Sequence, residues 1–132
     1  MEFNYKDYFT QEDLAKRGYN FEQDGVLETS HFASREDAID DFMNDAFDTI
    51  LHLIEDYRGE IWTEAYFTDM ASTNLEGTAL KWKKSLNKAL IEQAIFIYDN
   101  GNPNATFHDG RSQYAPKAIE ALWHNALNMG RG

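Results

Sequence analysis

The stretch that follows Ser34 constrains the fold most, because its hydrophobic residues keep a helical period for about six turns. Apolar residues recur at three- and four-residue steps, which places them in one broad arc of a helix. Ser34 is a favourable N-cap and Gly59 a favourable terminator, so we expect a helix over about 35–58. The apolar arc, which must pack against other helices, comprises Ile39, Phe42, Met43, Ala46, Ile50, Leu53, Ile54 and Tyr57.

A second long helix is expected over about 79–99, beginning near Thr78 and ending before Gly101. Its second half is apolar nearly all round, which is typical of a buried helix, so we expect it to be the central helix of the fold. Its first half instead carries four lysines, which are Lys81, Lys83, Lys84 and Lys88.

Shorter helices are expected at both ends of the chain. One runs from the N-cap Thr10 to about Arg17, before Gly18, and another begins with Pro116 at its first position. We expect residues 19–33 to form a loop or an extended arm, with a brief strand at 26–29. Residues 60–77 allow two interpretations, a short amphipathic helix followed by a loop, or a loop or interface segment throughout. The whole pattern predicts a single all-α domain over residues 1–132, a helical bundle.

Composition excludes several classes of protein. The chain contains no cysteine, so disulfide scaffolds, thiolate nucleophiles and cysteine-ligated zinc are excluded. The first residues lack the basic flank and apolar run of a signal peptide, and no apolar stretch is long enough to span a membrane. We therefore expect a protein made in the cytoplasm, with no membrane partner.

Charge is distributed unevenly along the chain, whose net charge is −11. Residues 1–76 carry 5 Lys and Arg against 19 Asp and Glu, whereas residues 77–132 carry 7 against 4. An acidic surface repels phosphate, so binding to duplex DNA is not expected. The lysines of the second long helix are more plausible partners for carboxylates, of the same chain or of a neighbouring copy, than for nucleic acid.

The acidic residues of the first long helix lie opposite its apolar arc, together with His52. A helical di-metal site needs inward-facing Glu-x-x-His motifs, and the helix expected over 35–58 has none, so we expect a solvated face or an electrostatic interface and no metal. No nucleophile elbow, Walker loop or dinucleotide-binding glycine motif occurs, and we expect neither an enzyme nor a cofactor. The acidic face comprises Asp37, Asp41, Asp45, Asp48 and Asp56.

Four segments in order resemble one known family. They are the opening 5–10, the stretch 45–50, the helix 84–98 with Lys88-Ala89-Leu90-Ile91-Glu92-Gln93-Ala94, and the proline-led 115–122. Over roughly residues 35–127 this order resembles the head–tail connector, or adaptor, proteins of long-tailed bacteriophages. The resemblance implies a non-catalytic helical bundle whose copies, usually twelve, form a ring below the portal protein. Such a ring extends the DNA channel in the virion neck, lets DNA pass without sequence-specific binding and carries the next neck or tail-completion protein.

The resemblance also implies roles for particular residues. In the family the C-terminal segment docks onto the portal, which corresponds here to Leu127, Asn128, Met129 and Arg131. The acidic face is then a candidate lumen or subunit-facing surface. Candidate subunit contacts are Trp62, Tyr66, Phe67, Lys81, Lys83, Lys84 and Lys88, although the aromatic residues are equally plausible as core. Two alternatives remain open, a small acidic helical inhibitor or DNA mimic, and a helical metal-dependent enzyme.

Overall fold

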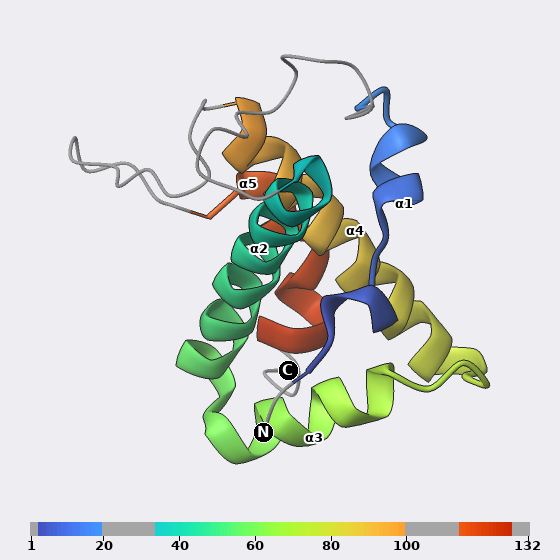
Figure 1. Cartoon of the computed structure of the whole chain (residues 1–132). Helices are drawn as coiled ribbons and strands as arrows, with labels where there is room; N and C mark the ends of the chain where they lie inside the picture. Colours follow the sequence, from blue (N-terminus) through green and yellow to red (C-terminus); the bar gives the residue numbers. More distant parts are fainter. Residues whose placement is uncertain (1–2, 20–33, 100–113, 128–132) are drawn as a thin grey trace.

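The computed structural model describes residues 3–19, 34–99 and 114–127, and within these ranges it is helical throughout, with short connections (Figure 1). No β-strand occurs among these described residues, so the predicted all-α class is confirmed. The predicted arm at 19–33 lies, apart from Tyr19, outside the described residues. The elements are η1 (Tyr5–Asp7), α1 (Gln11–Ala15), α2 (Arg35–Arg58), α3 (Glu60–Met70), α4 (Gly77–Asp99), α5 (Pro116–Leu122) and the π-helical turn η2 (Trp123–Leu127).

The starts of α1 and α2 and the end of α2 lie where the capping residues predicted them, whereas α1 ends at Ala15, before the predicted end at about Arg17. Thr10 and Asp13 form a capping box at the start of α1, each accepting a hydrogen bond from the other's backbone N–H. The Ser34 hydroxyl accepts from the Asp37 N–H at 3.2 Å at the start of α2. Gly59 ends α2 with φ +85° and ψ 162°, a conformation that is essentially restricted to glycine, and this turns the chain directly into α3.

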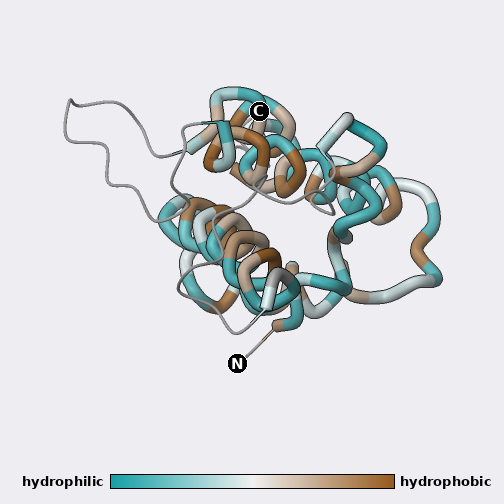
Figure 2. Tube along the Cα trace, turned by 45° about the horizontal axis from the view of Figure 1, so that its top comes forward, coloured by the Kyte–Doolittle hydropathy of each residue, from teal (hydrophilic) through white to brown (hydrophobic). Residues whose placement is uncertain are grey.

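Helix α4 is the central helix, as its all-round apolar second half predicts. It contacts α1, α2, α3, α5 and η2, and its most extensive contacts are with α5 and α2. Along the helices, hydrophobic and hydrophilic residues alternate in short stretches (Figure 2), as expected for helices that bury one side each. The fully buried large side chains are Phe9, Leu14, Phe42, Met43, Ile50, Ile54, Phe67, Met70, Leu86, Leu90 and Leu122.

Residues 60–70, for which the sequence allowed a loop or interface segment, form helix α3. The buried side chains of α3 include Tyr66, Phe67 and Met70, whereas Ile61 is 88% exposed. The large apolar residues of this segment therefore do not share one side, which explains why its period was ambiguous. Only residues 71–76 connect α3 to α4 without helix.

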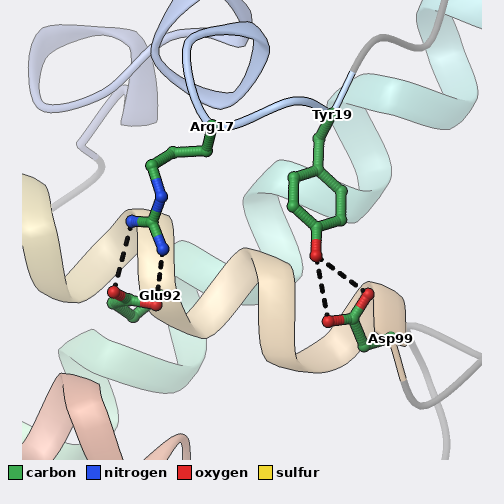
Figure 3. Close-up of polar contacts among 4 residues, drawn as sticks. All are labelled: Arg17, Tyr19, Glu92 and Asp99. Carbon is green, nitrogen blue, oxygen red and sulfur yellow. Dashed lines mark hydrogen bonds and ion pairs between the residues drawn. The ribbon is translucent and has the colours of Figure 1, made fainter.

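Polar contacts fasten the N-terminal segment to α4 (Figure 3). The Arg17 guanidinium donates to both oxygens of Glu92, at 3.2 and 3.4 Å, and the Tyr19 hydroxyl donates to Asp99 at 3.0 Å. The Asn87 amide donates to the Tyr8 carbonyl at 2.8 Å. These contacts, with the buried side chain of Leu14, hold α1 against the middle of α4.

Candidate functional site

The acidic face of α2 consists of five aspartates, which differ in how far they are exposed. Asp37, Asp48 and Asp56 are exposed, and Asp41 is partly exposed. His52, on the same side, is also exposed. The structure therefore places these side chains at the surface, where they can meet solvent or a partner.

Asp45 differs from the other members of the acidic face. Its side chain is half-buried, and within the described residues its Oδ2 atom is buried without a hydrogen-bond partner. Burial, followed by the charges of Asp41 and Asp48, raises the pKa of Asp45 from 3.8 to about 6. The middle of this face thus holds three carboxylates with no cation between them in the described part of the chain.

Three lysines form an exposed stripe on the first half of α4, and we refer to Lys81, Lys84 and Lys88 as the lysine stripe. Their spacing of three and four residues places them on one side of the helix. Lys83 belongs elsewhere, because it is partly buried and its ammonium donates to the Ser72 carbonyl at 2.8 Å. The Lys83 ammonium is thus already engaged by the connection between α3 and α4 of its own chain, and its contact with a neighbouring subunit stays a prediction.

The lysine stripe does not pair with the acidic face of its own chain. Among the described residues, no carboxylate of α2 lies within 4.0 Å of a lysine of the stripe. In Figure 1 the first turns of α4 lie at the lower right of the molecule, whereas α2 lies at the left. Of the two pairings that the sequence left open, within one chain or between copies, the first is therefore not made with α2.

Two of the aromatic residues predicted at a subunit contact belong to the core instead. Tyr66 and Phe67 are buried, and the Phe67 ring packs against those of Tyr8 and Phe47, with centroids 5.4 Å away in each case. Trp62 remains partly exposed, with its ring stacked on Tyr66. Because residues 60–70 form helix α3, Tyr66 and Phe67 point inward. The interpretation of this segment as a loop did not predict that direction.

The residues predicted to dock onto a portal fall partly inside the core and partly outside the described residues. Leu127 is buried at the end of η2 and is thus not available as a surface contact. Asn128, Met129 and Arg131 lie outside the described residues.

Small surface depressions are present among the described residues. One of them, of about 460 Å³, lies between the N-terminal segment and α2 and is open to solvent. Its lining includes Tyr5 and Asp40, which share a hydrogen bond, together with Lys6. Within residues 3–19, 34–99 and 114–127, no three His, Asp or Glu side chains are grouped so as to hold a metal ion. No helix in the described part of the chain is long and apolar enough to cross a membrane.

Sequence reasoning missed the buried polar groups of α4. Glu92 is only 7% exposed and pairs with Arg17, which lies 75 residues earlier in the chain. Gln93 is fully buried, and its Oε1 accepts from the N–H of Ala115 at 2.8 Å, just before α5. The available signal was the pair Glu92-Gln93 inside an otherwise apolar stretch, because polar groups in a buried helix require partners.

Comparison with known protein families, with curated proteins and with solved structures finds no match for this chain.

Proposed function

We propose that this chain is a structural virion protein, a head–tail connector (adaptor) subunit that forms a ring below the portal and extends the DNA channel. The observation that supports this best is the pair of exposed, oppositely charged faces on one helical unit, the acidic face of α2 and the lysine stripe of α4. A subunit that carries two complementary faces on different sides can contact the next copy head to side. Such heterologous contacts generate rings when the rotation closes.

The order of the four resembling sequence segments is the reason for proposing this particular family. The resembling stretches at 84–98 and 115–122 correspond to the central helix α4 and to the proline-led helix α5. Helix α4 contacts every other α-helix described, so the resemblance falls on the part of the chain that organises the fold.

The negative net charge agrees with a channel through which DNA slides. Lysine and arginine side chains that neutralise phosphates release counterions and hold DNA in place, whereas carboxylates repel it. Those members of the acidic face that are not engaged between subunits, such as the exposed Asp37 and Asp56, are suited to line such a lumen. We propose accordingly that the protein has no catalytic role and that it resides in the virion neck.

The test is electron microscopy of the purified chain mixed with the portal protein encoded beside it. We expect additional ring-shaped density on the tail-facing end of the portal, with the portal's rotational order. Portals that remain bare at micromolar concentrations of both proteins would refute the connector proposal.

A small acidic inhibitor that mimics DNA is the second candidate, and the exposed carboxylates of α2 favour it. The exposed lysine stripe argues against it, because a mimic of phosphate gains nothing from ammonium groups on its surface. Inhibition of a DNA-binding enzyme by this chain, relieved by added duplex DNA, would support the mimic over the connector.

A further inference from the structure

The spacing of charges on α2 and α4 defines how two copies fit together. The lysine stripe steps by three and then four residues along α4, from Lys81 to Lys84 to Lys88. Reading α2 from its C-terminal end, Asp48, Asp45 and Asp41 step by the same three and then four residues. At 1.5 Å per residue, both triplets span about 10 Å with the middle charge at the same height.

This match exists for one direction only. With α4 antiparallel to α2, a single register places a carboxylate level with each of the three lysines. In parallel orientation no register within α2 does so; the best ones pair two carboxylates with His52 or Asn44. Residues at the same height are offset sideways, and the flexible four-carbon stem of lysine spans such an offset.

We propose that α4 of one copy packs antiparallel across α2 of the next copy, with Lys81 opposite Asp48, Lys84 opposite Asp45 and Lys88 opposite Asp41. This inference rests on the proposed assembly function and specifies its subunit contact. The partner is a second copy of the same chain, because both halves of the complementary pattern are present on it and remain unpaired with each other. The contact also supplies a cation to the crowded middle of the acidic face, where Asp45 lies between two other carboxylates.

The described structure leaves this part of α4 open. Helix α1 and the N-terminal segment contact α4 at Asn87 and Glu92, yet all three side chains of the lysine stripe are exposed, including that of Lys88 between these contacts. Exposed ion pairs are individually weak, so we expect the isolated contact to be weak and sensitive to salt. Ring closure, in which every subunit is held on two sides, strengthens such contacts collectively.

The first test is carbodiimide coupling of the wild-type chain at low ionic strength, which joins an ammonium to a carboxylate only where the two touch. Mixing chains of natural and heavy nitrogen isotope content separates intermolecular from intramolecular products. We expect intermolecular links Lys81–Asp48, Lys84–Asp45 and Lys88–Asp41. Intermolecular links in another register, or no intermolecular product, would overturn the proposal.

The second test uses charge reversal at the two ends of the register, read out by sedimentation of the self-association equilibrium. Lys81→Glu with Lys88→Glu should weaken association by about tenfold or more, because two attractive pairs become repulsive. Adding Asp41→Lys and Asp48→Lys to the same chain should restore it. The matched control adds Asp37→Lys and Asp56→Lys instead, which restores the same net charge out of register, and should not rescue. Equal rescue by both quadruple variants would contradict the register.

Failure here is distinguishable from failure of the proposed function. If the Lys81→Glu, Lys88→Glu variant still builds rings on the portal, the register is wrong and the connector proposal stands. If the wild-type chain gives the three links yet leaves portals bare, the contact stands and the connector proposal is wrong.

Discussion

Replacing Asp45 by asparagine should stabilise the protein at neutral pH. Asp45 is half-buried between Asp41 and Asp48, its Oδ2 has no hydrogen-bond partner in the described part of the chain, and its pKa is raised from 3.8 to about 6. At neutral pH the folded protein therefore carries a carboxylate that would be more favourably ionised in the unfolded chain. Asparagine has nearly the same shape and carries no charge.

The expected gain follows from the shift in pKa. At about 1.4 kcal/mol per pKa unit, the rise corresponds to about 3 kcal/mol for a fully shielded group. Because part of the Asp45 side chain reaches water, screening reduces this to about 1–2 kcal/mol. For a domain of this size we expect Tm to rise by about 4–8 °C.

The sign of the pH dependence is fixed by proton uptake. Between pH 3.8 and about 6 the folded state binds more protons at Asp45 than the unfolded state, so the contribution of this group to stability falls as pH rises through that window. The variant lacks this fall. The free energy of unfolding, from urea denaturation followed by circular dichroism, should therefore differ little between Asp45→Asn and wild type near pH 4, and most above pH 7.

The matched control is Asp48→Asn, one turn along the same helix but exposed. It removes the same charge, so a general effect of lowering the net charge would appear in both variants. We expect less than half the gain of Asp45→Asn. A gain from Asp45→Asn that is equal at pH 4 and pH 8, or one matched by Asp48→Asn, would refute the assignment to burial of Asp45.

Three further predictions concern stability. Gly59→Ala should cost about 1–3 kcal/mol in urea unfolding, because φ +85° with ψ 162° is strained for any residue with a Cβ, and Glu60→Ala beside it should change little. Arg17→Met should destabilise the protein by about 1–2 kcal/mol, because it leaves the Glu92 carboxylate buried and unpaired. The double variant Arg17→Met, Glu92→Met should recover most of that loss. A double variant as unstable as Arg17→Met alone would show that the pair is not coupled. Gln93→Met should cost about 1–3 kcal/mol, because the buried N–H of Ala115 loses its acceptor, and amide exchange should accelerate first in α5.

The sequence by itself determined the two long helices and the starts of the short helices α1 and α5, but not helix α3. Caps and terminators act within one turn, so Ser34, Gly59 and Pro116 could be assigned from neighbouring residues alone. The period of hydrophobic residues likewise depends only on the directions in which side chains leave one helix axis. For this reason α2 and the central position of α4 were predictable.

Only the tertiary structure decided which charged and aromatic groups are free. Lys83 and Lys84 are adjacent in sequence, yet one is held by the Ser72 carbonyl and the other is exposed. Asp45 and Asp48 share a helix face, yet only Asp45 is half-buried. A periodic pattern gives the direction in which a side chain leaves its helix, but whether it then meets water or another segment depends on contacts between residues far apart in the chain. Burial, and with it pKa and availability for a partner, is therefore a property of the packed molecule.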